Sequence, residues 1–266
     1  MITSTSNANI KEVVQLRKKS KARSQAGAFL VEGIRMIQEV PKERLVKLYV
    51  TEGFYKKYQQ ELEVLRSKER GVKPELVSDT VFAYMSDTKT PQGVLGIVKQ
   101  VDYSMRELLE VTEGKPHLMV LDNLQDPGNL GTIFRTAEAA GVTGILMSRD
   151  CVDIYNPKTI RSTMGAIYRM PFVYVDDLQK AIGTLKEHGV HTYAAHLDGK
   201  HAYDQEDYRE GTAFFIGNEG NGLRPEIAAC ADTWIRIPMH GQVESLNAAV
   251  AASVLMFEVS RQRRNS

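Results

Sequence analysis

A stretch rich in turn formers, "DNLQDPGNLGTIFRTAEAAG" (122–141), follows a strand-like run and leads into an expected helix. That order is typical of a nucleotide-binding βα turn. Gly128 and Gly131 form only a G-x-x-G, however, and neither G-x-G-x-x-G nor G-x-x-x-x-G-K-[ST] occurs in the chain. NAD and nucleoside triphosphates are therefore poor candidates for its ligand.

The same stretch still predicts a polar site. Asp126, Pro127 and Gly128 predict a tight turn, after which Asn129 stands where a helix N-cap belongs. Exposed N–H groups at that helix start are suited to an anion such as a phosphate, and Arg135 follows within the helix. From spacing alone, an ordinary helix cap by Asn129 and a surface ion pair by Arg135 are favoured over a functional site.

Two later stretches add groups that can orient a substrate. In "FFIGNEGNGL" (214–223), Glu219 stands among closely spaced glycines, which let the backbone approach a ligand; burying such an acid is costly unless it has a partner. In "IRIPMHGQVESLNAAVAA" (235–252), Ser245 and Asn247 lie at the expected start of the last helix. Helix capping is the ordinary role of such residues.

Charge is unevenly distributed along the 266 residues. Residues 1–100 hold 18 Lys and Arg against 11 Asp and Glu, a net of +7, and the remainder hold 16 against 22, a net of −6. The basic residues of the front part are clustered, which favours a polyanionic partner such as nucleic acid. The cluster that we expect to contact RNA phosphates comprises Lys11, Arg17, Lys18, Lys19, Lys21 and Arg23.

The front part alternates short strand-like and helical runs, which predicts a small α/β domain. The stretch "IKEVVQLRKKSKARSQAG" (10–27) is expected to be a helix that runs into a basic loop, and another helix is expected over 54–68. Residues 101–116 carry charge and end in Gly and Pro, so we place a linker there and the domain boundary near residue 105.

The second half alternates more regularly, which predicts a mostly parallel sheet covered by helices. Helices are expected over 129–140, 156–169, 177–188 and 244–263, with Asn156 and Pro157 starting the second. On the last helix, one face is expected to pack on the sheet or on a second subunit, and it comprises Leu246, Val250, Ser253, Val254 and Phe257.

The two cysteines and the N-terminus place the protein in a reducing compartment. Cys151 and Cys230 form no Cys/His pattern, and no signal-like or membrane-spanning apolar segment occurs. We therefore expect a cytoplasmic protein without a membrane partner. The histidines at 188, 191, 196 and 201 have no cysteine partners, so we expect no metal site, and without G-x-S-x-G a hydrolase is disfavoured.

Taken together, the three stretches resemble the three motifs of the SpoU/TrmH branch of the SPOUT methyltransferases. The motifs occur in order across roughly residues 115–260. The front part is similar to the family's substrate-binding domain, which resembles kink-turn-binding ribosomal proteins; "FLVEGIRMI" and "TPQGVLGIV" carry that likeness. The resemblance implies an RNA substrate-binding domain over 1–105 and a SPOUT catalytic domain with a deep trefoil knot over 106–266.

The resemblance also implies the reaction. The donor is S-adenosylmethionine, the acceptor is a ribose 2′-hydroxyl of RNA, and the working form is a homodimer packed through the knotted domain, with an active site completed by both subunits. The residues implied for the donor are Leu197, Gly217, Ile237, Met239 and Leu246. Those implied for catalysis are Asn129, Arg135, Glu219, Ser245 and Asn247.

The resemblance implies that Arg135 is the base that removes the proton from the ribose hydroxyl, and elementary chemistry argues against this role. A guanidinium has a pKa above roughly 12 and is normally a permanent cation. We therefore expect Arg135 to orient the hydroxyl and the adjacent phosphate and to stabilise the developing alkoxide, with the proton acceptor left open between Arg135 and the RNA phosphate.

Lys158 and Arg161 are expected to touch RNA, although Thr163 replaces the serine that related chains usually carry there.

Several alternatives remain open from the sequence. The added basic front domain favours large-subunit ribosomal RNA as the substrate, with transfer RNA second. A methyltransferase acting on a base, and a non-catalytic RNA-binding protein that keeps the fold, are the other readings.

Overall fold

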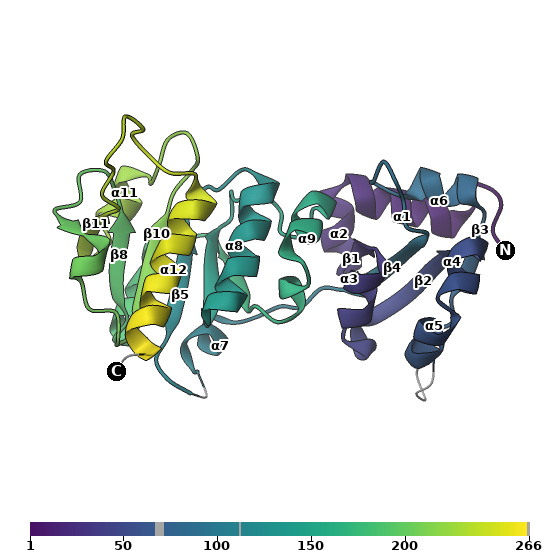
Figure 1. Ribbon diagram of the computed structural model, residues 1–266, viewed down its shortest axis with the longest axis horizontal. Coiled ribbons are helices and arrows are strands. Elements are labelled where there is room, and N and C mark those ends of the chain that lie inside the picture. The colour runs from purple at the N-terminus through teal and green to yellow at the C-terminus, as the bar shows by residue number, and fades with distance from the viewer. Residues whose placement is uncertain (67–71, 112, 265–266) are drawn as a thin grey trace. The chain divides into compact units, whose positions relative to one another are not determined.

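The computed structural model describes residues 1–66, 72–111 and 113–264 (Figure 1). The chain divides into two compact units: Met1–Val101 with Asp153–Tyr168, and Asp102–Val152 with Arg169–Ser266. The first division falls close to the expected boundary near residue 105. The inclusion of Asp153–Tyr168 in the first unit has no counterpart in the sequence analysis.

The first unit is built on a mixed sheet. Among the described residues its strands are β1 (Ala28–Glu32), β2 (Leu45–Thr51), β3 (Glu75–Val77) and β4 (Val94–Lys99), in the order β1-β4-β2-β3. Strand β4 pairs antiparallel with β1 and β2, and β2 pairs parallel with β3. The small N-terminal α/β domain is thus confirmed.

The helices of this unit are α1 (Ala8–Lys18), α2 (Ser20–Ala26), α3 (Ile34–Glu39), α4 (Glu52–Lys57), α5 (Gln59–Arg66), α6 (Asp79–Met85) and α9 (Pro157–Thr163). Apolar side chains of α1 and α6, among them Val13 and Phe82, form one core with the sheet.

Two expectations for these helices were wrong. The basic loop expected at the end of the stretch 10–27 is instead the helix α2, which ends at Gly27 in the left-handed conformation. The expected helix over 54–68 is divided into α4 and α5 around Tyr58; residues 67 and 68 lie outside the described part of the chain.

The second unit contains the larger sheet. The described residues form seven strands in the order β7-β6-β5-β10-β8-β11-β9, and every pairing is parallel. They are β5 (His117–Leu121), β6 (Gly144–Ser148), β7 (Phe172–Val175), β8 (His191–Ala195), β9 (His201–Ala202), β10 (Thr212–Ile216) and β11 (Thr233–Arg236). The expected parallel sheet is confirmed.

Helices cover both faces of this sheet. They are α7 (Met105–Leu109), α8 (Pro127–Ala140), α10 (Leu178–Glu187), α11 (Pro225–Ala228) and α12 (Ala248–Arg264). Helices α7, α10 and α11 share one apolar core with the sheet. Helices α8 and α12 run side by side (Figure 1). Part of the expected linker 101–116 is the helix α7, and its residue 112 lies outside the described residues.

The last helix differs from its expectation in start and in facing. It begins at Ala248 instead of residue 244. Its buried residues include Ala252, Leu255 and Met256, so the predicted face is not the one that packs on the sheet. Packing of that face on a second subunit, the other expected arrangement, stays a prediction. On that predicted face, Val250 and Phe257 are each 49% exposed.

The parallel arrangement places the ends of the central strands at one edge of the sheet. Strands β5, β10, β8 and β11 are consecutive neighbours, so the loops that follow them meet at their carboxyl ends. All three sequence motifs lie in these loops. None of the helices within the described ranges is long and apolar enough to cross a membrane.

Candidate active site

The loop after β5 ends in a helix start that differs from the expected one. Helix α8 begins at Pro127, and the Asp126 side chain caps it by accepting a hydrogen bond from the N–H of Asn129 at 2.8 Å. Proline is favoured at the first helical position and aspartate at the cap, so Asp126–Pro127 starts the helix two residues earlier. The prediction that Asn129 is the N-cap was wrong, and its side chain is free for other contacts.

Glu219 supplies those contacts from the loop after β10. Its Oε2 accepts from the N–H of Gln125 at 3.0 Å, and its Oε1 accepts from the N–H of Asp126 at 2.8 Å and from Nδ2 of Asn129 at 3.0 Å. Burial raises the pKa of Glu219, but these hydrogen bonds outweigh burial and hold the pKa below its usual value. Glu219 is therefore an ionised carboxylate that joins the first two motifs.

This arrangement also changes the expected anion site. The N–H groups of Gln125, Asp126 and Asn129 are already taken by carboxylates of the chain itself. Pro127 has no N–H to offer. These groups at the start of α8 are therefore not available to a phosphate in this structure.

The glycine-rich loop that carries Glu219 is a compact turn. Asn218 and Gly222 exchange two backbone hydrogen bonds of 2.9 Å, and Oδ1 of Asn218 accepts from the N–H of Gly220 at 3.0 Å. A Cβ on Gly217 would lie 2.1 Å from the carbonyl carbon of Gly222, so only glycine fits there. The loop is therefore shaped by its own backbone.

The third motif joins the same network. Nδ2 of Asn247 donates to Oδ1 of Asn129 at 3.0 Å. Oδ1 of Asn247 accepts from the N–H of Ala249 at 2.9 Å and so caps α12. Asn247 thus has both the capping role and a link to the first motif. A chain of hydrogen bonds, Asn247–Asn129–Glu219, connects all three motifs.

Two other expected residues make no such contact. Arg135 lies exposed on α8, and within the described part of the chain its guanidinium has no hydrogen bond or ion pair. The partner that the acid at position 219 requires is therefore not Arg135 but the backbone N–H groups of Gln125 and Asp126 together with the amide of Asn129. Ser245 is exposed in the loop before α12, and its hydroxyl has no partner among the described residues.

The residues expected to hold the donor follow three neighbouring strands. Leu197 comes after β8, Gly217 directly after β10, and Ile237 and Met239 after β11, with Leu246 in the loop before α12. Leu197 is 65% exposed, which is unusual for a large apolar side chain, and the other three apolar residues are half-buried. Apolar side chains after neighbouring strands are the kind that would contact the adenosine part of a nucleoside cofactor.

The expected RNA-binding arginines of the first unit have structural contacts. Arg23 is buried and donates through Nε and Nη2 to Oδ2 of Asp153, at 2.9 and 2.5 Å. Nη1 of Arg17 donates to the carbonyl oxygens of Tyr84 and Ser86. The burial of Arg23 keeps it from RNA phosphates, so we remove it from the expected RNA surface.

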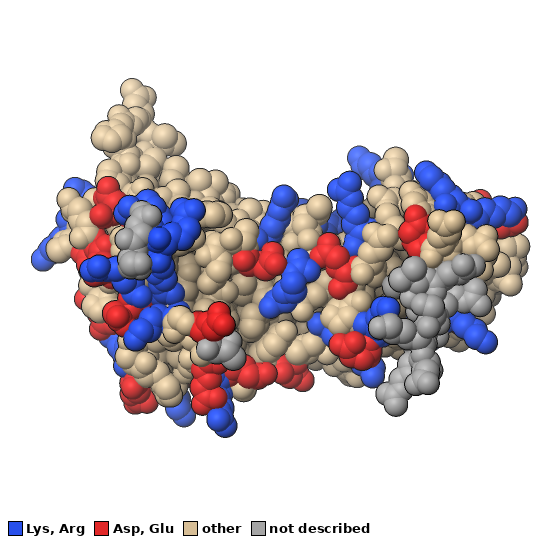
Figure 2. All heavy atoms as spheres, turned by 60° about the horizontal axis from the view of Figure 1, so that its bottom comes forward, with Lys and Arg blue, Asp and Glu red and all other residues tan. Residues whose placement is uncertain are grey.

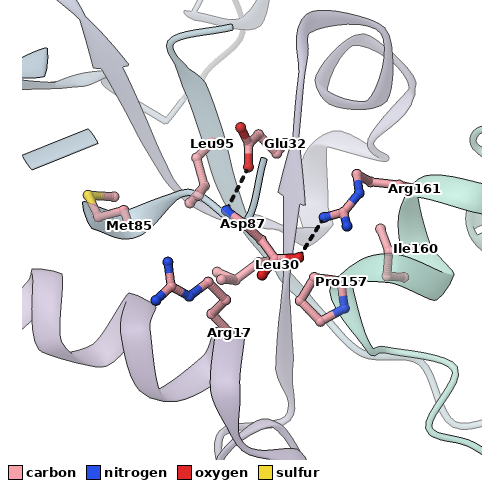
Figure 3. A pocket seen from close by; sticks show the side chains of 9 residues that line it. All are labelled: Arg17, Leu30, Glu32, Met85, Asp87, Leu95, Pro157, Ile160 and Arg161. Atoms are coloured by element: carbon pink, nitrogen blue, oxygen red, sulfur yellow. Dashed lines mark hydrogen bonds and ion pairs between the residues drawn. The ribbon is translucent and has the colours of Figure 1, made fainter. Parts of the chain in front are cut away.

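Arg17 and Arg161 line one pocket of the first unit (Figure 3). Arg161, on α9, donates to Oδ2 of Asp87 at 3.0 Å, and Glu32 also borders the pocket. The pocket therefore carries balanced charge.

The lysines of this unit are more accessible. Lys11, Lys18, Lys19 and Lys21 are exposed on α1 and α2 or beside them, and Lys158 is exposed on α9. Basic and acidic side chains are interspersed on the face that Figure 2 shows. The side chains of this unit that remain candidates for RNA contact are therefore these exposed lysines.

Two residues of the site escaped the sequence analysis. Asp122, directly after β5, is buried. Arg224, which follows the glycine-rich loop, forms an ion pair with Asp122. The available signal was the position of Asp122, because a charged residue that ends the apolar run "HLMVL" requires a partner.

Comparisons with known proteins agree with this geometry. A family model described as the SpoU rRNA Methylase family matches residues 116–257, more than half of the chain. The chain belongs to the SpoU rRNA methylase family. A second model, described as the MRM3-like substrate binding domain, matches residues 7–96. The expected family is thereby confirmed.

Individual relatives cover nearly the whole chain. The 23S rRNA (guanosine(2553)-2′-O)-methyltransferase RlmP of Bacillus subtilis is 30% identical over 97% of this chain and 98% of its own length. The 23S rRNA (guanosine-2′-O-)-methyltransferase RlmB of Coxiella burnetii is 32% identical over 92% and 97%. The AdoMet-bound rRNA methyltransferase of Sinorhizobium meliloti superposes with a TM-score of 0.85 at 30% identity, covering 98% and 97%. This SpoU family member is a methyltransferase whose donor is S-adenosylmethionine.

Proposed function

We propose that this protein transfers a methyl group from S-adenosylmethionine to a ribose 2′-hydroxyl of 23S ribosomal RNA. The observation that carries the proposal is the hydrogen-bond chain Asn247–Asn129–Glu219, which joins the three motifs of a SpoU family member. Relatives over the full length of the chain are named as 23S rRNA 2′-O-methyltransferases, which favours ribosomal RNA over transfer RNA.

The chain's own residues orient the acceptor. The bound donor supplies an electrophilic methyl group on a sulfonium. Asn129 is held by Glu219 on one side and Asn247 on the other, so its amide is fixed before the acceptor arrives. Arg135, exposed and unpaired within the described residues, is available to the ribose and its phosphate, where a fixed cation stabilises the developing alkoxide. Leu197, with Ile237, Met239 and Leu246, would hold the donor.

The direct test is methyl transfer from tritiated S-adenosylmethionine onto RNA from cells that lack the gene. We expect label in 23S rRNA, and nuclease digestion with mass spectrometry should find it as a 2′-O-methylnucleoside. Label on a base, or in transfer RNA, would show that the proposed acceptor is wrong and would identify the actual one. An absence of transfer to any RNA would support a non-catalytic RNA-binding protein.

We assign RNA binding to residues 1–105 and methyl transfer to residues 106–266. The family models support this division, because they match 7–96 and 116–257 separately. Lys18, Lys19 and Lys21 are exposed and are the proposed phosphate contacts. Their replacement by Ala together should weaken RNA binding and reduce its salt dependence, with donor affinity unchanged in calorimetry. Unchanged RNA affinity would contradict the assignment.

A homodimer through the catalytic unit belongs to the same proposal. Its support is the pair of apolar side chains Val250 and Phe257, which lie about two helical turns apart on α12 and are each 49% exposed. Charged replacements, Val250→Asp with Phe257→Asp, should yield monomers in light scattering, whereas Val46→Asp, on an exposed residue of β2, should not. A wild-type monomer would refute the dimer.

We also assign to this protein the deep trefoil knot and a cytoplasmic location. Family membership supports the knot. The free thiols of Cys151 and Cys230 support the location, because reducing compartments keep cysteines unpaired. Detection of the protein in a membrane fraction would contradict the second assignment.

A further inference from the structure

An ion pair between the buried carboxylate of Asp122 and the half-buried side chain of Arg224 joins the end of β5 to the end of the glycine-rich loop. Asp122 is 0% exposed. Its Oδ1 accepts from Nε of Arg224 at 2.8 Å and also from Nη2, and its Oδ2 accepts from the backbone N–H of Arg224 at 3.0 Å. Both carboxylate oxygens are therefore occupied by one residue.

This contact fixes more than a side chain. A surface salt bridge leaves the main chain free, whereas the bond to the N–H of Arg224 sets the position of the backbone itself. The Asp122 carboxylate holds the pKa of Arg224 above its ordinary value. Nη1 of Arg224 also lies 3.3 Å from Oδ2 of Asp150, whose carbonyl oxygen accepts from Nε2 of Gln125 at 2.6 Å. The loops after β5, β6 and β10 are thus tied together through Arg224.

The glycine-rich loop is attached to the β5 end at both of its own ends. At the start, Nδ2 of Asn218 donates to the carbonyl oxygen of Asn123 at 2.9 Å. At the end, Arg224 meets Asp122. Between these two attachments stands Glu219, whose oxygens must reach N–H groups of the β5 loop and the amide of Asn129. A shift of either end moves Glu219.

We propose that Asp122 and Arg224 are positioning residues for methyl transfer, a role that rests on the proposed function. The ion pair keeps the glycine-rich loop in the register that places Glu219 on Asn129. The same register also sets the position of Gly217, which is on the donor side of the loop. Loss of the pair therefore weakens donor binding and slows transfer, although neither residue contacts the reacting atoms.

The test compares two ion pairs in which Nε and Nη2 of the arginine donate to the same carboxylate oxygen, and only the Asp122 pair also includes a backbone N–H of the arginine. Asp122→Asn with Arg224→Gln removes both charges and leaves no unpaired buried carboxylate. The matched control is Asp153→Asn with Arg23→Gln in the first unit, where Nε and Nη2 also share one carboxylate oxygen. For each protein we measure the melting temperature, the Kd for S-adenosylhomocysteine by calorimetry, and kcat and KM for tritium transfer.

We expect both double variants to melt at lower temperature. Only the Asp122/Arg224 variant should bind S-adenosylhomocysteine at least about tenfold more weakly and lose kcat at saturating donor. Arg224→Lys separates geometry from charge, because a lysine supplies the cation without the planar fork. It should melt near the wild type and still bind S-adenosylhomocysteine several-fold more weakly.

Two results would overturn the proposal. One is an unchanged Kd and kcat in the Asp122/Arg224 variant despite a lower melting temperature. The other is an equal loss of donor affinity in the Asp153/Arg23 control. Wild-type protein that fails to bind S-adenosylhomocysteine or to methylate RNA would count against the proposed function instead, and the two failures are therefore distinguishable.

Discussion

Nδ2 of Asn247 donates a hydrogen bond to Oδ1 of Asn129, 118 positions away in the sequence, at a distance of 3.0 Å. Because Asn129 in turn donates to Glu219, its amide is bonded at both its oxygen and its nitrogen. This fixed amide is the centre of the site.

Asn247 has two roles that substitution can separate. Asn247→Ala removes the cap of α12 and the bond to Asn129, so it should cost about 1 kcal/mol of stability and a larger part of turnover. Asn247→Ser restores a capping oxygen but is too short to replace the amide. Chemical denaturation and single-turnover transfer should show Ser near the wild type in stability yet deficient in rate. Recovery of both would reduce Asn247 to a cap.

Removal of the Arg135 guanidinium should abolish transfer without affecting the donor. Arg135→Ala is expected to lower the rate by at least about 10²-fold, because a fixed charge near the developing alkoxide is lost. Calorimetry with S-adenosylhomocysteine should give the wild-type Kd. Arg209→Ala, at an exposed arginine outside the three motifs, is the control. A large fall in donor affinity would assign Arg135 to the donor site instead.

The carboxylate of Glu219 should stay ionised throughout the working pH range. Burial raises its pKa, but the hydrogen bonds from Gln125, Asn129 and Asp126 lower it by more, so the pKa of Glu219 lies below its usual value. The rate profile of the wild type between about pH 5 and pH 9 should therefore show no acid limb from this group. Glu219→Gln, which loses one acceptor oxygen, should transfer slowly at every pH. Full activity of this variant would show that the charge is dispensable.

The glycine-rich loop offers a matched pair of substitutions. Gly217→Ala should lower both stability and donor affinity, because its Cβ would lie 2.1 Å from the backbone of Gly222. At Gly220 the nearest atom to an added Cβ is Oδ1 of Asn218 at 3.6 Å, an ordinary contact. Gly220→Ala should therefore bind S-adenosylhomocysteine as the wild type does. Calorimetry on both variants checks this prediction. Equal affinities of the two variants for S-adenosylhomocysteine would show that close packing at Gly217 does not affect donor binding.

His117 should make stability depend on pH. It is buried at the start of β5, and within the described residues its Nε2 has no hydrogen-bond partner. Burial and the nearby Arg263 lower its pKa from 6.5 to about 3. Between pH 6.5 and about pH 3, His117 is protonated in the unfolded chain but neutral in the folded one. The free energy of unfolding therefore decreases as the pH falls from 6.5 toward 3.

Melting temperatures at about pH 7 and pH 4 measure this effect. The decrease should be smaller in His117→Leu than in the wild type, whereas His240→Leu, at an exposed histidine, should retain the full decrease. Identical decreases in all three proteins would show that other groups cause the pH dependence.

Local sequence patterns determined most of the elements. The alternating runs of the second half correspond to β5, β6, β7, β8, β10 and β11, because apolar strands between turn formers carry their own signal. Asn156 and Pro157 start α9 as expected, since capping is a short-range interaction. The resemblance of the three motifs to the SpoU/TrmH family also followed from sequence alone.

Tertiary structure decided what each side chain does. Whether Asn129 caps a helix or bonds Glu219 depends on a loop 90 residues away, and the burial of Arg23 depends on Asp153. The sequence around Arg23 shows that basic residues are numerous there, but it does not show which of them is buried. The pairing of Asp122 with Arg224 is likewise set by the neighbouring positions of β5 and β10 in the sheet. Partners that are distant in sequence meet only when the strand order is known, and local spacing carries no information about that order.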